Sequence, residues 1–109
     1  MARHAQANEG ASAALPQEPF GEVVRRLAAE QRLTLRALAR ASTVSVSHLS
    51  RIMRGVDGKV PKASVMTSVA RVLGIDPAVF PEYREGIARE AVAADPRLRD
   101  EIYVRASGG

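Results

Sequence analysis

The residues of this chain best suited to specific chemistry lie in the segment 46–54, VSHLSRIMR. At helical spacing, Leu49 and Ile52 point inward and a short, largely polar face points outward. This outward face consists of Val46, Ser47, His48, Ser50, Arg51 and Arg54. Small hydroxyls and arginine can hydrogen-bond to the edges of DNA bases, and an apolar side chain can contact the thymine methyl group. The pattern favours a helix inserted in the major groove of duplex DNA, with a solvated helix face as the alternative.

Other residue combinations that could support catalysis lack essential parts. The segment 55–59, GVDGK, has the residue types of a phosphate-binding loop without its full spacing, its following Ser/Thr or a preceding strand. Ser47, His48 and Asp57 include the side-chain types of a catalytic triad. However, adjacent residues on a helix project in different directions, and no oxyanion loop is evident. We therefore expect no enzymatic activity.

The chain contains no cysteine and only two histidines, His4 and His48, which lie far apart in sequence. It therefore has neither a disulfide framework nor a local metal-ligand set, and we expect no metal and no cofactor. No apolar run approaches the roughly 20 residues of a membrane span, and the N-terminus lacks the apolar stretch of a signal peptide. These features predict a soluble cytoplasmic protein, associated with the nucleoid if DNA is its partner.

Two short helices joined by a tight turn are predicted within residues 33–55. Thr34 is suited to cap a helix in which Leu38 and Ala39 face inward, and the polar run 42–45, STVS, interrupts that helix. Ser45 can cap the second helix, and Gly55 can end it in a left-handed conformation. This is the spacing of a helix-turn-helix.

Further helices are predicted on both sides of this pair. Apolar residues repeat at helical spacing from Phe20 to Ala28 and again from Ala63 to Leu73, where Gly74 closes the helix. Asp76 and Pro77 form an N-cap and first-turn pair that opens a short fifth helix, which Pro81 is predicted to stop. The segment 82–105 continues as helix, with a second Asp-Pro start at residues 95–96.

Length and composition agree with an all-α fold. The 109 residues, 46% hydrophobic but only 4% aromatic, suit one compact domain with a core of aliphatic side chains. We predict a flexible N-terminal arm over residues 1–19, a compact five-helix domain over 20–81, and a C-terminal helical extension with a short tail over 82–109.

Positive charge is concentrated in the part of the chain that holds the helix-turn-helix pattern. Residues 20–75 contain ten Lys/Arg and three Asp/Glu, while residues 76–109 contain five and seven, respectively. A surface that only needs solubility usually intersperses the two signs, whereas phosphate neutralisation requires such a concentration.

The run from Phe20 to Phe80 resembles the lambda repressor-like domain of the Xre/Cro family of transcriptional regulators. The resemblance rests on several short motifs whose spacings agree together: Leu33-Thr34, Leu38-Ala39-Arg40, Val44-Ser45, Leu49-Ser50-Arg51-Ile52, Arg54-Gly55 and Leu73-Gly74-Ile75. In that family the third helix lies in the major groove, and the N-termini of the second and third helices hold the phosphate backbone. The resemblance implies a sequence-specific regulator of double-stranded DNA.

Carried over residue by residue, the resemblance implies two sets of DNA contacts. The implied base readers are Val46, Ser47, Ser50 and Arg51. The implied backbone contacts are Thr34, Thr43, Ser45, His48, Arg54, Lys59 and Lys62. For Arg51 the alternative is a surface ion pair, and for Lys59 and Lys62 it is a solvated loop.

The chain departs from the family pattern at three positions around the turn. Leu35 stands where Gln is frequent, Thr43 where Gly is common, and Ser42 where a core leucine is usual. Leu35 cannot make the amide hydrogen bonds of Gln. The two turn residues indicate either a shifted turn or fewer apolar contacts beneath it.

The C-terminal extension lies outside the resemblance. Its apolar stripe either pairs with a second copy or covers the core of the monomer. We favour a homodimer through residues 82–105 that reads a palindromic operator. Binding of two half-sites multiplies the specificity of a dimer. A protein-interaction module on the same fold, such as an antitoxin or accessory subunit, is the alternative function. No feature indicates a small-molecule effector.

Overall fold

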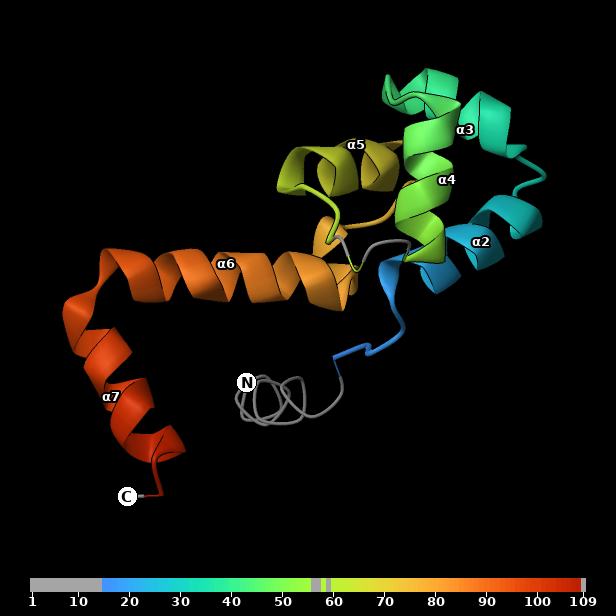
Figure 1. The fold of residues 1–109 in the computed structure, drawn as a ribbon. Coiled ribbons are helices and arrows are strands. Elements are labelled where there is room, and N and C mark those ends of the chain that lie inside the picture. Colours follow the sequence, from blue (N-terminus) through green and yellow to red (C-terminus); the bar gives the residue numbers. More distant parts are fainter. Residues whose placement is uncertain (1–14, 56–57, 59, 109) are drawn as a thin grey trace, which may run out of the picture.

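The computed structural model describes residues 15–55, 58 and 60–108, and all secondary structure in these residues is helical (Figure 1). The all-α prediction is therefore confirmed. In chain order the elements are α2 (Phe20–Glu30), α3 (Leu35–Ser42), α4 (Val46–Arg54), α5 (Ala63–Leu73), the 3-10 turn η2 (Pro77–Val79), α6 (Pro81–Ala94) and α7 (Pro96–Ala106).

One hydrophobic core joins α2 to α5 and the residue after η2. Its fully buried members come from every one of these elements: Phe20, Val23, Val24, Leu38, Leu49, Val69 and Phe80. The rings of Phe20 and Phe80 meet edge to face, with centroids 4.7 Å apart at an angle of 67°. This geometry is favourable for aromatic pairs, and it fixes the start of α2 against the end of η2.

The predicted caps define the helices of the central pair. The Thr34 hydroxyl accepts a hydrogen bond from the Ala37 amide at 3.0 Å, and the Ser45 hydroxyl accepts one from the His48 amide at 3.1 Å. Gly55 and Gly74 end α4 and α5 with φ of 68° and 76°. These left-handed conformations favour glycine because it has no Cβ to clash.

The fifth helix of the domain takes a different form from the predicted one. Asp76 caps it as expected, accepting a hydrogen bond from the Ala78 amide at 2.8 Å, but the element is a 3-10 turn of three residues. Phe80 is extended, because a residue that precedes proline disfavours the helical conformation. Pro81 therefore does not end a helix; it occupies the first turn of α6.

The helices α2 and α4 approach very closely at Gly21. A Cβ added at this position would lie 2.2 Å from the Met53 carbonyl oxygen, so only glycine fits. At its other end α2 is attached to α5, because the Gln31 side chain donates to the Leu73 carbonyl at 2.9 Å. The helix α2, against which α4 packs, is thus fixed at both of its ends.

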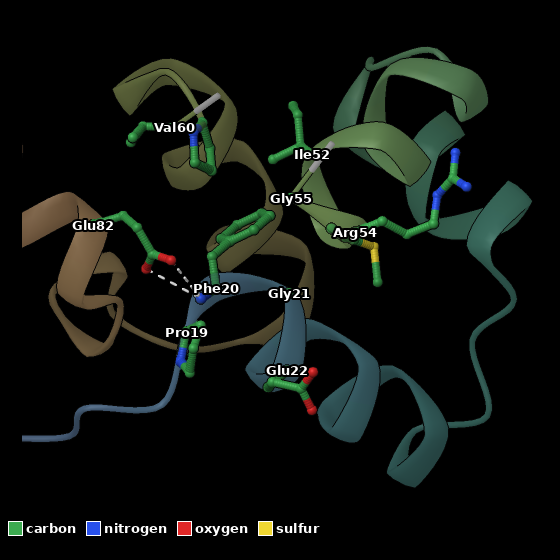
Figure 2. A pocket seen from close by; sticks show the side chains of 11 residues that line it. Pro19, Phe20, Gly21, Glu22, Ile52, Arg54, Gly55, Val60 and Glu82 are labelled. Atoms are coloured by element: carbon green, nitrogen blue, oxygen red, sulfur yellow. Dashed lines mark hydrogen bonds between the residues drawn. The ribbon is translucent and has the colours of Figure 1, made fainter. Parts of the chain in front are cut away.

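Two side chains of α6 attach this helix to the beginning of the domain. The Glu82 carboxylate accepts hydrogen bonds from the Phe20 amide at 3.0 and 3.1 Å (Figure 2). It thereby caps the N-terminus of α2, where a negative charge is favourable. The Arg84 guanidinium donates to the carbonyls of Pro16, Ala78 and Val79, so the segment 15–19 also lies against α6.

Beyond this attachment, α6 extends away from the domain and α7 turns back at an angle (Figure 1). The Asp95 carboxylate caps α7 by accepting from the amides of Arg97 and Leu98. No helix in the described part of the chain is long and apolar enough to cross a membrane.

Candidate nucleic-acid interface

The helix α4 presents one face to solvent because its other face is anchored in the core. Leu49 is fully buried, Ile52 is buried beside it, and α4 packs against both α2 and α3. Residues three and four apart lie on one face of a helix, so this anchoring turns positions 47, 50, 51 and 54 away from the core. The predicted orientation of the segment is confirmed.

The four predicted base readers are not equally accessible. Ser47 and Arg51 are exposed, Val46 is 37% exposed, and Ser50 is half-buried. The Arg54 Nε donates to the Ser50 carbonyl at a long distance of 3.4 Å, so this guanidinium lies beside the last turn of α4. The structure places the predicted set on one helix, and their contacts with bases remain a prediction.

Four of the seven predicted backbone contacts, Thr34, Thr43, Ser45 and His48, lie at the starts of α3 and α4, whereas Arg54 ends α4. Thr34 and Ser45 already accept the capping hydrogen bonds described above, but a hydroxyl can accept and donate at once, so each O–H can still donate to a phosphate. Thr43 and His48 are exposed beside Ser45. Helix N-termini attract anions through their free N–H groups and dipole.

The two predicted lysines differ in what the structure says of them. Lys62 is exposed and occupies the N-cap position of α5, where its side chain makes no capping hydrogen bond. Lys59 lies outside the described residues. The contact of Lys62 with phosphate therefore remains a prediction, and its side chain is accessible for such a contact.

The turn between α3 and α4 shows how the three unusual residues are accommodated. Thr43 adopts the left-handed conformation, with φ of 61°, that glycine takes more easily. Ser42 is buried, and its hydroxyl has no hydrogen-bond partner. Leu35 is half-buried and packs against the core instead of facing solvent. The turn therefore keeps its conformation with backbone strain at Thr43 and an unsatisfied hydroxyl at Ser42.

A groove of about 370 Å³ beside α4 brings in an arginine that the sequence analysis missed. It is lined by Leu35, Ser50 and Arg54 together with Arg25 of α2. Arg25 is exposed and pairs with Glu22 at 3.1 Å, which leaves other donors of its guanidinium available. The signal was weak, because Arg25 is only one of several charged residues on the outer face of α2.

A second pocket, at the C-terminal end of α4, differs chemically from this groove. Its lining includes Phe20, Glu22, Gly55, Val60 and Glu82 (Figure 2). The predicted backbone contact Arg54 lies at its edge, but no predicted base reader lines it and the Glu82 carboxylate is directed at the Phe20 amide, so we assign this pocket to the support of α4.

A surface ion pair joins α2 to the segment that precedes it. Arg26 donates to Glu18 at 2.7 Å, and this hydrogen bond lowers the pKa of the Glu18 carboxyl from its ordinary value. A carboxyl with a lowered pKa contributes stability above its unfolded-state pKa and loses that contribution as the pH falls through the lowered value. The contribution is small because both side chains are well exposed.

Comparison with known proteins identifies the family to which this arrangement of helices belongs. A family model described as a helix-turn-helix domain matches residues 19–82, which include all of α2 to η2. The match agrees with the Xre/Cro resemblance. No curated protein and no solved structure matches the chain.

Proposed function

We propose that this chain is a sequence-specific transcriptional regulator that binds double-stranded DNA through α4. The chain belongs to the helix-turn-helix family, because the family model covers more than half of it. The observation that carries the proposal is the anchoring of α4. Its apolar face is buried against α2 and α3, while the hydroxyl and guanidinium groups on its other face reach solvent. The proposal includes no catalytic step and no cofactor.

In this proposal α4 lies in the major groove and reads bases directly. Arg51 can donate two hydrogen bonds to guanine, the hydroxyls of Ser47 and Ser50 can reach either donors or acceptors, and Val46 can contact a thymine methyl group. The N-termini of α3 and α4 hold phosphates on either side. Phosphate contacts set the orientation of the domain, and base contacts supply the preference for sequence.

We further propose that the protein acts as a homodimer through residues 82–105 on a palindromic operator in the cytoplasm. Two domains related by a two-fold axis would read half-sites one helical turn, about 34 Å, apart. Two features support the dimer: α6 and α7 extend beyond the domain, and large apolar side chains remain exposed on them.

The test begins with selection of binding sites from a random library of duplexes of about 30 base pairs, long enough for two half-sites. The affinity of Arg51→Ala for the selected duplex is then compared with that of the original protein. We expect a loss of about 1–3 kcal/mol and a relaxed preference at one base position.

Arg71→Ala is the matched control, because it removes the same charge from an exposed position on α5. It should retain both affinity and preference. If Arg51→Ala keeps the affinity and the base preference of the original protein, α4 does not read DNA through this residue. If no duplex is enriched at all, the protein-interaction module becomes the better account of the fold.

A further inference from the structure

The helix α7 carries large apolar side chains that remain well exposed in the described part of the chain. Ile102 is 45%, Tyr103 69% and Val104 58% exposed. The helix packs against α6 and stands apart from the body of the domain (Figure 1). Consecutive side chains of a helix project in different directions, so they do not share one face, and Tyr103 is the most exposed of the three. A large exposed aromatic side chain on a well-formed helix indicates a contact with a partner.

A groove that could receive such a helix lies between α5 and α6. It encloses about 270 Å³, its floor includes the buried Pro61 and Met66, and its walls include Val60 and Ile87. Val60 is 55% and Ile87 49% exposed. Gly86 also lines the groove, and a Cβ added there would meet nothing within 4 Å, so the missing side chain leaves the groove open.

The charges on the two surfaces are complementary. Three carboxylates line the groove: Glu82 already accepts from the Phe20 amide, Glu85 pairs at 2.7 Å with the single basic lining residue, Arg89, and Glu90 lies beside them. The helix α7 carries Arg97, Arg99 and Arg105 against two carboxylates, and Arg99 pairs with Asp100. Unlike charges at the rim of an apolar contact favour the correct pairing over other pairings.

The connection between α6 and α7 keeps each helix α7 out of the groove of its own chain. Only Asp95 separates the two helices, and Pro96 holds it in an extended conformation. Antiparallel helices that lie side by side are about 8–10 Å apart and are usually joined by a loop of about two to five residues. One residue is too short for such a hairpin.

We infer that the groove between α5 and α6 receives α7 of a second copy, and that the exchange is reciprocal. The inference rests on the dimer proposed above and specifies how it assembles. The same contact then occurs twice around a two-fold axis, as in other closed dimers. Tyr103, the most exposed of the three side chains, would cover Val60 and Ile87 and enter the open space at Gly86.

Disulfide crosslinking tests the inference directly, because the chain has no cysteine of its own. The full-length variants Gly86→Cys and Tyr103→Cys are mixed in equal amounts and oxidised. We expect a disulfide-linked dimer that contains one chain of each variant as the main product. A product dominated by Tyr103→Cys linked to itself would show that α7 pairs with α7, and would overturn the inference.

Two further outcomes also overturn the inference. A chain carrying both substitutions that forms a disulfide within itself, and stays monomeric on dilution, would show that α7 closes onto its own groove. A protein that remains monomeric in sedimentation equilibrium at all concentrations would exclude the dimer altogether.

A second pair of variants avoids cysteine chemistry. Gly86→Leu fills the groove without clashing in the monomer, and Ala88→Leu places the same side chain at an exposed position of α6 that does not line the groove. We expect Gly86→Leu to raise the dimer dissociation constant about tenfold or more, and Ala88→Leu to leave it unchanged. Equal effects of the two substitutions would contradict the proposed contact.

DNA binding separates failure of this inference from failure of the proposed function. If the inference holds, Gly86→Leu still binds a single half-site as the original protein does, and loses affinity only for the palindrome. If the original protein binds no duplex, the proposed function fails, whereas the crosslinking result still decides how two chains pair.

Discussion

At the scale of single residues, Gly21 determines how closely α2 can approach α4. The 2.2 Å that would separate an added Cβ from the Met53 carbonyl oxygen is far below a normal contact, and the obstacle is backbone. We expect Gly21→Ala to destabilise the fold by about 1–3 kcal/mol, because overpacking displaces the backbone. Urea unfolding measures the change.

Gly86 provides the control for this prediction. It lies inside a helix, but its Cβ would meet open space. At concentrations where the protein is monomeric, Gly86→Ala should therefore stabilise it by about 0.5–1 kcal/mol through helix propensity alone. If Gly21→Ala were as stable as Gly86→Ala, α2 and α4 would not approach each other as closely at Gly21 as described above.

Ser42 gives a second prediction at this scale. Its hydroxyl is buried without a hydrogen-bond partner at the end of α3, and a buried polar group without a partner is unfavourable. Ser42→Ala should leave the free energy of unfolding unchanged or raise it by about 1 kcal/mol. The exposed Ser64→Ala serves as the reference, and a clear destabilisation of Ser42→Ala alone would reveal a hydrogen bond that this account lacks.

At the scale of elements, Glu82 connects the C-terminal extension to the N-terminus of α2. The carboxylate accepts from the Phe20 amide and interacts with the helix dipole, and both effects weaken when the group is neutral. Glu82→Gln should lower the free energy of unfolding at neutral pH by about 0.5–2 kcal/mol.

The reference for that substitution, measured where the protein is monomeric, is Glu90→Gln, which changes an exposed carboxylate farther along the same helix. Equal stability of the two variants would mean that the Glu82 cap contributes nothing. A loss confined to Glu82→Gln would show that α6 is held on the domain by this cap.

The helix ends could be predicted from sequence because their causes are local. The caps of α3 and α4 depend on Thr34, Ser45 and Gly55, each of which acts within a few residues. A short fifth helix was predicted from Asp76 and Pro77, with Pro81 as its stop. Its form was missed because Pro81 begins α6 instead, keeps Phe80 extended and leaves room for one 3-10 turn.

The contacts that fix the elements relative to one another could not be predicted. Glu82 and Phe20 are 62 residues apart, and no pattern in the sequence relates them. The groove beside α4 likewise depends on how α2 and α4 cross, so Arg25 could not be distinguished from other exposed arginines. Which exposed residues contact bases depends on a partner that a single chain does not contain.

At the scale of the whole molecule, the separation of charge predicts how binding responds to salt. Residues 20–75 carry an excess of seven positive charges, and each phosphate contact releases counterions. Lys62→Ala should weaken binding to all duplexes alike and reduce the salt dependence by about one unit on a logarithmic plot.

Arg97→Ala is the matched change for this prediction, because it removes a charge from α7, beyond the helix-turn-helix domain. It should leave the salt dependence of single-half-site binding as it was. A slope unaltered by Lys62→Ala would remove this lysine from the phosphate-binding surface.

The central claim is that the exposed face of α4 reads DNA sequence, and one titration tests it most directly. Fluorescence anisotropy compares the affinity of the full-length protein for the selected duplex and for a shuffled duplex of equal composition, at several salt concentrations. The account predicts a preference of about a thousandfold or more for the selected duplex, together with steep salt dependence. Equal affinity for both duplexes, or no binding even at low salt, would contradict it.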